Sequence, residues 1–517
     1  MTITPPRVFA FVIALAAVLY AARLGRAPIH IGADEARFAI QAHAVATTGR
    51  DLNGTRLPLF FHVTNPLVAG DNPPAWWQPT LFYLMAMVFR IAPVSIAAVR
   101  IPTVCLAVLN VLLIYLVARR LFANPWLAVF AALLLALTPA HFVLGRQAMD
   151  YFCPLTFALA WLWLLLASLQ TDRASLPWMT GAVLGVGLYS YITSWMVMPA
   201  YLAMTLIVFH VGGKPGRWSA AVSIGFALAL VPLAPWLFFH PSLPSETFRN
   251  YLVGHGARAA ERLSLYWDYF NPSYLFFSGG SNPMWATRRA GVFLLVAAVL
   301  LPIGVRQLIA VKPSPVPRLV LLAFVMAPLP IVIGLPEDPR YFTPRDLLVV
   351  PFGVLICTAG IEWLLERGRG VGRVAAFACV AAALMQFTAF ARDYFTDYQL
   401  RSAYRFDDVN FQAVMSAVVA ADSAGRVPLV FLNDDLQESR VAQWKFHSLA
   451  RGRDDIWQRT RYFKAAALNL QDLPAGSLLV LHANDPAVPL LTATDCSIDA
   501  IVNGVTDQPA SVILRRR

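Results

Sequence analysis

The chain has 517 residues, of which 58% are hydrophobic and 14% are charged, and its mean hydropathy is +0.59. A water-soluble protein of this size cannot bury so much apolar surface in one core, so the composition excludes an ordinary soluble protein and indicates a membrane protein. The net charge of +12 comes mainly from Lys and Arg in short gaps between apolar segments. This distribution is typical of topology signals, and no nucleic acid partner is expected.

Apolar segments long enough to cross a bilayer, about 20 residues each, recur from Phe9 to Phe390. The first segment is interpreted as a retained span rather than a signal peptide, because Arg23 and Arg26 follow it and no small-residue cleavage site is clear. Eleven spans are predicted, at residues 8–24, 101–118, 125–144, 152–169, 176–192, 195–211, 218–239, 289–310, 318–335, 343–363 and 372–391.

The charges between these spans predict the topology. With a cytoplasmic N-terminus, every loop on the cytoplasmic side contains Lys or Arg, as the positive-inside rule requires. The interval 176–211 leaves an alternative open, because one long span there would reverse the topology of everything after it. Outside lie the long loops 25–100 and 240–288 and the tail from residue 392. The sequence thus predicts a multi-pass protein of the cytoplasmic (inner) membrane, surrounded by membrane lipids.

Two domains are predicted, an all-α membrane domain over residues 1–391 and a small extracytoplasmic α/β domain over residues 392–517. In the first outer loop, Asp34 is placed to cap a helix that ends at Gly49. Residues 79–99 are apolar but interrupted by Arg90 and Pro93, which predicts an interfacial helix.

The tail alternates the apolar runs VPLVFLN and SLLVLHA with a helical run, a pattern typical of α/β domains. The 5 cysteines have neither a paired framework nor a CxxC spacing, so neither disulfides nor a zinc site is predicted.

Several short motifs occur in order on the same predicted side of the membrane. They are GADEARF at residues 32–38, DNPPAWWQP at 71–79, RIP at 100–102 before a span that ends ARRLF, RQAMDY at 146–151 and RYFTP at 340–344. Together they resemble the GT-C glycosyltransferases of the protein mannosyltransferase and aminoarabinose transferase group (glycosyltransferase family 39-like). The resemblance covers roughly residues 1–390 and does not extend to the tail.

The resemblance implies a GT-C fold and an enzyme, a hexosyl- or pentosyltransferase that takes a sugar from a polyprenyl-phosphate donor. The sugar would pass to an acceptor hydroxyl at the outer face of the membrane, on a protein, a lipid or a glycan. An acceptor hydroxyl attacks poorly while it keeps its proton, so this chemistry requires a carboxylate base.

By resemblance the catalytic carboxylates are Asp34, with its neighbour Glu35, and Asp150. Asp34 has a second interpretation as a helix cap, worth about 1 kcal/mol. Asp150 is predicted to help hold the acceptor or a divalent cation, and its alternative is a residue at the start of an interfacial helix.

The donor phosphate requires a cation. Asp71 and Asn72 occupy the place where the family often has Glu-Lys, so both are substrate-binding candidates, but Asn72 brings no positive charge. The contact with the donor phosphate is therefore assigned to an outer arginine, first to Arg340 with Tyr341, because a guanidinium group can bind a phosphate through two parallel hydrogen bonds. The other candidates are Arg37, Arg146, Arg288, Arg289 and Arg345. For each of them, contact with lipid headgroups is the alternative.

Trp76 and Trp77 are candidates for stacking on a sugar, with an aromatic belt at the interface as the competing interpretation. No cofactor is predicted with certainty. A divalent cation, Mg²⁺ or Mn²⁺, fits the chemistry of some GT-C enzymes, but the outer His, Asp and Glu residues show no recognised ligand spacing.

Two other classes of function remain as alternatives. A lipid or sugar transporter, or flippase, requires charges or broken helices at midmembrane, and the predicted spans are nearly free of internal charge. In a membrane scaffold with an outer sensing domain, the acidic pair Asp34 and Glu35 would have no role.

The tail is expected to recognise the acceptor rather than to perform transfer, because it shows no acidic cluster near the membrane edge. Its Asp434, Asp435 and Asp485 are interpreted as turn and cap residues.

The predicted topology places the N-terminus inside and the C-terminus outside. A reporter that is active only outside the cytoplasm, fused after Arg392, should therefore be active. Silence of this fusion together with activity of a matching cytoplasmic reporter would overturn the topology.

Overall fold

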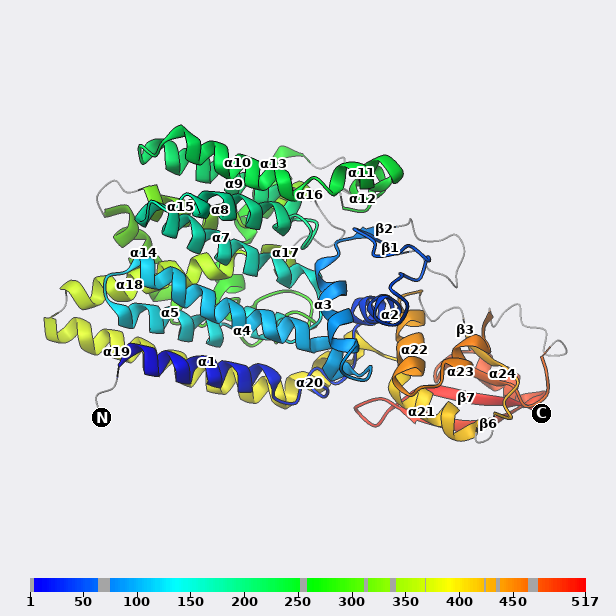
Figure 1. Cartoon of the computed structure of the whole chain (residues 1–517). Helices are drawn as coiled ribbons and strands as arrows, with labels where there is room; N and C mark the ends of the chain where they lie inside the picture. Colours follow the sequence, from blue (N-terminus) through cyan, green and yellow to red (C-terminus); the bar gives the residue numbers. More distant parts are fainter. Residues whose placement is uncertain are drawn as a thin grey trace.

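The computed structural model describes residues 4–63, 75–251, 258–310, 315–334, 341–367, 369–422, 425–433, 438–463 and 473–517. Figure 1 shows a large layered bundle of helices, with a smaller lobe of mixed strands and helices at one end. The C-terminus lies in the smaller lobe.

The bundle follows the predicted spans closely. Each of the eleven predicted segments contains at least one described helix. The helices are α1 (Pro5–Ala21), α4 (Ile96–Leu121), α5 (Pro125–Leu137), α6 (Pro139–Leu144), α7 (Cys153–Gln170), α8 (Ser175–Gly187), α9 (Ser194–Val211), α10 (Gly216–Ala229), α11 (Leu233–Phe239), α14 (Ala297–Ala310), α15 (Pro315–Met326), α16 (Leu329–Gly334), α17 (Thr343–Asp346), α18 (Val349–Arg367) and α19 (Arg369–Phe395).

Within the described residues, 7 helical stretches are long and apolar enough to cross a membrane by themselves. The chain is thus a multi-pass membrane protein, whereas the number of eleven spans and the direction of insertion stay predictions. The interval 176–211 contains two helices, α8 and α9, as the prediction required. Several other predicted spans are divided, as at Pro139 and Pro232, where proline removes a backbone donor and interrupts the helix.

Helix pairs in the bundle approach closely through glycine. A Cβ added at Gly181 of α8 or Gly225 of α10 would collide with backbone of the facing helix. The same holds for Gly304 of α14 and Gly360 of α18. Small residues at such crossings are the usual way for membrane helices to gain packing contacts.

The first long loop is ordered around α2 (Ala33–Thr48), followed by a hairpin of β1 (Phe61–Val63) and β2 (Ala75–Trp77) and by α3 (Thr80–Phe89). Gly49 ends α2 in the left-handed conformation, as predicted. The predicted cap is wrong, since Gly32 is the N-cap and Asp34 lies inside the first turn. The helix predicted over 79–99 is also too long, because α3 ends at Phe89 and Ser95 caps α4.

The second long loop contains α12 (Leu243–Tyr251), α13 (Ala259–Asp268) and a short π-helix, η2 (Ser273–Ser278). After it the chain stays irregular up to Ala297, eight residues beyond the predicted start of this span at residue 289.

The tail contains a mixed five-stranded sheet in the order β4-β3-β5-β7-β6, which confirms the predicted small α/β part. Its strands are β3 (Val430–Asn433), β4 (Thr460–Phe463), β5 (Leu478–His482), β6 (Cys496–Asn503) and β7 (Pro509–Arg516). Its helices are α20 (Asp397–Phe406), α21 (Phe411–Ala421), α22 (Glu438–Ala450), α23 (Asp454–Gln458) and α24 (Ala487–Ala493). Asp485 accepts a hydrogen bond from Ala487 N at 2.8 Å, which fits the expected turn role, whereas Asp434 and Asp435 lie outside the described residues.

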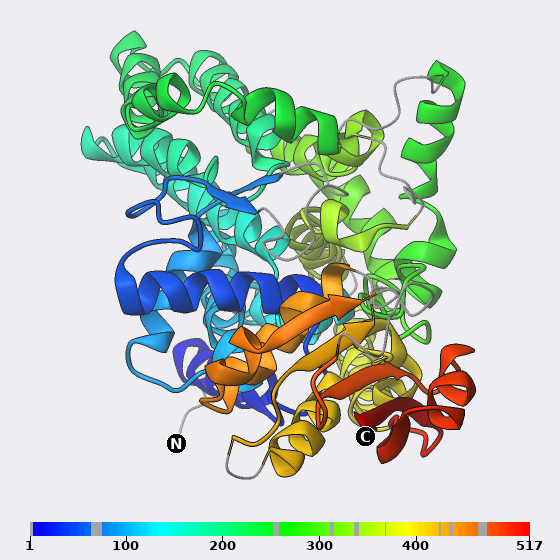
Figure 2. The same ribbon diagram turned by 90° about the vertical axis from the view of Figure 1, so that its right-hand side faces the viewer.

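The tail docks on the bundle through α22, which packs against α2 (Figures 1 and 2). The Gln443 amide donates to the carbonyl oxygens of Ile31 and Phe406, each at 2.7 Å. His30 and His447 are buried in this region, and burial lowers the pKa of His30 to about 4 and that of His447 to about 3. Both imidazoles are therefore neutral at neutral pH, and the contact buries no positive charge from them.

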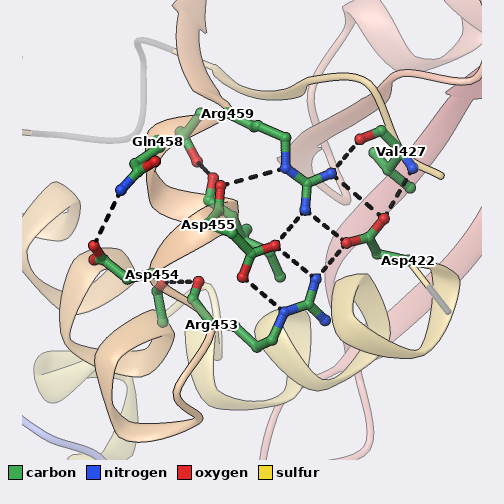
Figure 3. Close-up of polar contacts among 10 residues, drawn as sticks. Asp422, Val427, Arg453, Asp454, Asp455, Gln458 and Arg459 are labelled. Carbon is green, nitrogen blue, oxygen red and sulfur yellow. Dashed lines mark hydrogen bonds and ion pairs between the residues drawn. The ribbon is translucent and has the colours of Figure 1, made fainter. Parts of the chain in front are cut away.

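An ion-pair network holds α21, α23 and β4 together inside the tail (Figure 3). Asp422 is 1% exposed and pairs with Arg453 and, at 2.8 Å, with Arg459. Both arginines also pair with Asp455. Burial alone would raise the pKa of Asp422, but hydrogen bonds from Arg459, the Val427 amide and Arg453 outweigh it and lower this pKa below its ordinary value.

We expect Asp422→Ala to destabilise the tail by about 3–5 kcal/mol, because it leaves two guanidinium groups short of a partner. Asp495→Ala is the matched control, since Asp495 forms a half-exposed pair with Arg516 at 3.7 Å, and such pairs contribute about 1 kcal/mol or less. Amide hydrogen exchange of the full chain, read on peptides from 411–463, measures both changes.

The lowered pKa of Asp422 sets the sign of the pH dependence. In the unfolded chain the carboxyl takes up its proton near its ordinary pKa, about 3.9, while the folded protein still holds it ionised. Protection of the same peptides should therefore be full above about pH 4 and fall below it. Equal protection of the Asp422→Ala and Asp495→Ala proteins would contradict this account.

Candidate active site

The site is built on a buried ion pair between α2 and α4. Glu35 is 1% exposed and Arg100 is fully buried. Arg100 Nε donates to Glu35 Oε1 at 2.9 Å and its Nη2 donates to Oε2 at 3.0 Å. The remaining guanidinium hydrogens go to the carbonyl oxygens of Leu24, Pro28 and His30 at 2.7–3.1 Å.

Glu35 is saturated by these contacts and two more. Its Oε2 accepts from Gly32 N at 2.8 Å, so the N3 carboxylate satisfies the N-cap backbone N–H of α2, and its Oε1 accepts from Ala148 N at 2.9 Å. A carboxylate offers about four lone-pair positions, and all are in use. The predicted catalytic role of Glu35 does not fit this geometry, because no position remains to accept a proton; Glu35 instead fixes the start of α2.

Asp34 precedes Glu35 and has the opposite environment. Its side chain is 41% exposed, and its Oδ1 lies 3.2 Å from Arg37 Nη1. Because Gly32 is the N-cap, the competing interpretation of Asp34 as a helix cap is wrong. Asp34 is thus an accessible carboxylate on a rigid helix start, and Arg37 is its partner.

Asp150 begins a short 3-10 helix, η1 (Asp150–Phe152), and its side chain is 2% exposed. Its Oδ2 has no hydrogen-bond partner among the described residues. Electrostatic interactions link Asp150 with Asp34 and with Arg345, which comes from α17, a helix that packs against η1. Arg345 also interacts with Tyr191. The structure therefore brings two predicted carboxylates and one predicted arginine together.

Arg146 has a structural role. It is fully buried, and its guanidinium donates to the carbonyl oxygens of Leu19, Tyr20, Ala22 and Ala27 and to the Tyr394 hydroxyl. The predicted donor-phosphate role of Arg146 does not fit, because these contacts occupy its five N–H groups.

The other phosphate candidates are scattered. Arg288 is exposed and donates to Gly280 O at 3.0 Å, and Arg289 pairs with Asp393 and Asp397. Tyr341 stacks on Tyr274 with ring centroids 5.3 Å apart. The first-choice residue, Arg340, lies outside the described residues.

The candidate sugar-binding tryptophans are packed side chains. Trp76 is 6% exposed and donates to Glu246 Oε2 at 2.6 Å. Trp77 packs edge-on against Phe38 at 4.7 Å. Asp71 and Asn72 lie outside the described residues.

Gln78 is a polar residue that sequence reasoning missed. It directly follows Trp77 and is 1% exposed, yet neither polar atom of its amide has a partner among the described residues. An unpaired buried amide costs about 1–3 kcal/mol, so a residue of this kind is a candidate for contact with a bound molecule. In the sequence, Gln78 could have been found only from its position directly after the pair Trp76 and Trp77.

A cavity of about 280 Å³ opens beside Asp34. It is lined by Gly32, Ala33, Asp34, Glu35, Gln147, Met149, Tyr151, Met284, Trp285, Tyr404, Arg405, Phe406, Asp407, Asp408 and Gln443. Tail residues thus share the cavity with Asp34. Asp407 and Asp408, two acidic tail residues that the sequence analysis did not single out, line the same cavity as Asp34.

Asp407 is one of the tail residues that line the cavity. Its carboxylate accepts hydrogen bonds from the backbone N–H groups of Val409, Asn410 and Phe411 at 2.7–3.1 Å, just before α21. Burial raises the pKa of Asp407 to about 7, although these hydrogen bonds oppose the shift. The residue therefore organises the turn between α20 and α21.

Metal ligands are sparse in the described part of the chain, where no group of three His, Cys, Asp or Glu side chains is placed to hold an ion. Dependence on Mg²⁺ or Mn²⁺ stays a prediction.

Both the sequence and the fold of the chain resemble those of known proteins. A family model described as dolichyl-phosphate-mannose-protein mannosyltransferase matches residues 71–239. Comparison of the sequence with curated proteins gives no significant match.

Among solved structures, ArnT from Cupriavidus metallidurans bound to undecaprenyl phosphate aligns with a TM-score of 0.61 at 14% identity, covering 98% of this chain and 97% of that chain. Its apo state gives a TM-score of 0.59 at 14% identity with the same coverage, 98% and 97%. AglB from Archaeoglobus fulgidus, in complex with an inhibitory peptide and a dolichol-phosphate, gives 0.49 at 13% identity over 85% of this chain and 63% of that chain.

The chain has the GT-C fold. The likeness extends over nearly the whole chain, tail included, whereas the sequence motifs indicated it only to about residue 390. The resemblance to the mannosyltransferase and aminoarabinose transferase group is confirmed.

We expect Glu35→Gln to destabilise this GT-C protein by about 3–5 kcal/mol, because it leaves the buried Arg100 charge uncompensated. Asp34→Asn should cost about 1 kcal/mol or less, since its pair with Arg37 is partly exposed. Thermal unfolding of the purified protein in detergent compares the two. If the Glu35→Gln protein unfolds at the same temperature as the wild type, the ion pair does not stabilise the site.

Proposed function

We propose that the protein is a membrane glycosyltransferase that moves a sugar from a polyprenyl-phosphate donor to an acceptor hydroxyl at the outer face of the cytoplasmic membrane. The observation that carries the proposal is the accessible carboxylate of Asp34, which lines a cavity. The ion pair of Glu35 and Arg100 fixes the start of the helix to which Asp34 belongs. The GT-C fold and the match to a mannosyltransferase family model support the reaction class.

Asp34 is the proposed general base. The acceptor hydroxyl gives its proton to Asp34 as its oxygen bonds to the anomeric carbon of the sugar. The bond from that carbon to the donor phosphate breaks, and polyprenyl phosphate leaves with the bonding electrons. A base in place before attack contributes typically about 100- to 10,000-fold in rate.

The donor phosphate is assigned to the side of Asp34 that contains Arg345. A guanidinium close to Asp150 and Tyr191 offers charge to the leaving phosphate, and this geometry favours Arg345 among the outer arginines that the structure describes. Arg340 and Tyr341, adjacent in sequence to the same short helix, remain the second proposed contact.

A polyprenyl donor fits a multi-pass protein, because its tail partitions into the bilayer beside the helices. ArnT, with a related fold, binds undecaprenyl phosphate. The outer face is proposed from the Lys and Arg distribution, which assigns the loops bearing Asp34 and Asp150 to that side. We further propose the division into a membrane domain, residues 1–391, and a tail domain, residues 392–517, although α19 continues to Phe395.

We expect Asp34→Asn to lower the transfer rate by about 100- to 10,000-fold while leaving donor binding nearly unchanged, because the amide keeps the shape but cannot accept the proton. The measurement is transfer from a radiolabelled polyprenyl-phosphate sugar in membranes that contain the variant, with donor affinity determined separately. Normal turnover by correctly inserted Asp34→Asn protein would make Asp150 the next candidate base.

Arg345→Ala and Arg340→Ala are the contrasting variants. Loss of a phosphate-holding cation should weaken donor binding and turnover together, since the cation acts on the ground state and the transition state alike. Arg90→Ala is the matched control, because Arg90 is exposed and is not a phosphate candidate.

A further inference from the structure

A second cavity, separate from the one beside Asp34, is a groove on the surface of α19. This helix is long and apolar enough to cross a membrane, yet only 22% of its most apolar stretch is buried inside the protein. Figure 1 shows it along the edge of the bundle. Most of α19 therefore faces lipid, and a groove on it is open to lipid molecules.

The groove, called the α19 groove below, lies near the end of the helix that leads into the tail. Its volume is about 870 Å³, within the range of small-molecule sites, about 300–1,000 Å³. It is lined by Arg289, Leu384, Met385, Thr388, Ala389, Arg392, Asp393, Thr396 and Asp397.

The α19 groove changes from apolar to charged along its length. Leu384, Met385 and Ala389 are exposed and form its apolar half. Met385, Ala389 and Arg392 follow one another at spacings of three or four residues, so they share one face of the helix. From Leu384 to Arg392 the helix rises by about 12 Å.

This change in polarity coincides with the predicted edge of the membrane. The sequence predicts a span over residues 372–391, so Arg392 stands where the hydrocarbon gives way to lipid headgroups. A molecule that fills the α19 groove therefore has to be apolar at one end and polar at the other, as a membrane lipid is.

The charges at the polar end are unequal. Asp393 is 10% exposed and accepts from Arg289 Nη1 at 2.7 Å and from Arg401 Nη2 at 2.7 and 2.8 Å. Asp397 pairs with Arg289 at 3.1 Å. Two arginines are thus balanced by two aspartates. Arg392 is exposed, and its side chain forms no ion pair with any residue that the structure describes, so one positive charge remains.

A single positive charge at headgroup level selects a group with a single negative charge. The phosphodiester of a phospholipid carries one, and a guanidinium group can bind it through two parallel hydrogen bonds. Arg289 uses its Nη1 for both aspartates, so its other N–H groups can add to the contact. A zwitterionic lipid fits less well, because its ammonium group returns a positive charge beside Arg392.

We propose that the α19 groove binds one anionic phospholipid. The phosphodiester is bound by Arg392 and Arg289, and an acyl chain lies along Leu384, Met385 and Ala389. This site does not depend on the proposed reaction, since none of these residues lines the cavity beside Asp34.

The bound lipid contacts the connection between the bundle and the tail. Arg401 belongs to α20, and it links Asp393 of α19 with Thr287 O at 3.3 Å. Asp393 also lines the α19 groove. A ligand that binds the folded state stabilises it, so phosphatidylglycerol should raise the temperature at which the purified protein unfolds.

Photolabelling tests the site directly. The purified full chain in detergent is irradiated with phosphatidylglycerol that carries a photoactivatable group on an acyl chain, and the labelled peptides are identified by mass spectrometry. Label is expected on peptides that contain residues 384–397, and unlabelled phosphatidylglycerol should displace it at about fivefold lower concentration than phosphatidylcholine, because one arginine at a membrane surface contributes roughly that factor.

Two outcomes of the competition would overturn the proposal. If phosphatidylcholine displaces the label as well as phosphatidylglycerol does, the groove makes only the general lipid contacts of a membrane helix. If undecaprenyl phosphate displaces it at lower concentration than phosphatidylglycerol, the groove belongs to the polyprenyl donor rather than to a phospholipid.

Two variants test the assignment of residues. Arg392→Ala should weaken labelling by phosphatidylglycerol about fivefold, and Ala389→Trp should weaken it by filling the apolar half without changing any charge. Both positions are exposed, so both proteins are expected to fold like the wild type. Arg90→Ala is the matched control, since Arg90 is an exposed arginine at the end of α3 that does not line the groove. Labelling of Arg392→Ala and Ala389→Trp equal to that of Arg90→Ala would refute the site.

Discussion

The ion pair between Glu35 and Arg100 is the constraint on which the site depends. A buried ion pair stabilises a fold only when its remaining hydrogen-bonding positions are filled, because taking two charges out of water is expensive. Here all five N–H groups of Arg100 and all four lone-pair positions of Glu35 have partners. Those partners belong to the chain after α1, to the start of α2 and to the segment before η1. One pair therefore fixes three connections that hydrophobic packing alone would leave free to shift.

The direction of Asp34 follows from this pair. Successive residues on a helix are rotated by about 100°, so burying Glu35 against Arg100 turns Asp34 out of the packed face. Arg146 has a similar effect, because it donates to carbonyl oxygens that the end of α1 leaves unsatisfied and to Ala27 O in the segment after it. Irregular backbone inside the hydrocarbon region is tolerated only where the protein or a water-filled cavity satisfies its polar groups. Both buried arginines thus act on the backbone, and the chemistry is left to more exposed side chains.

Hydropathy and turn chemistry were sufficient to predict much of the fold. Long apolar runs predicted where helices form because that preference is local, and Gly49 marked the end of α2 because only glycine takes its conformation without strain. The exact starts of helices were less accessible, as at Asp34 and at residue 289. Pairing between distant segments decided them: Glu35 with Arg100, and Phe293 with the backbone of Leu275.

The site itself was only partly predictable. The sequence could not distinguish Asp34 from Glu35, or Arg146 from Arg345, since neighbours of the same chemistry differ only in what the tertiary structure brings against them. Tail residues were missed for the same reason. Asp407 and Asp408 lie more than 350 positions from Asp34 in the sequence, and the packing of α20 on α19 and of α22 on α2 brings them to the same cavity.

The proposed reaction separates two demands on the protein. A general base must keep its position to within a fraction of an ångström, and such precision requires rigid elements with locked neighbours. Acceptor choice depends on shape and on hydrogen-bond donors, and it must be able to differ between related proteins. Asp34 stands on a helix whose start is fixed by Glu35 and Arg100, whereas the tail, which supplies Tyr404–Asp408 and Gln443 to the same cavity, contains a sheet with a hydrophobic cluster of its own.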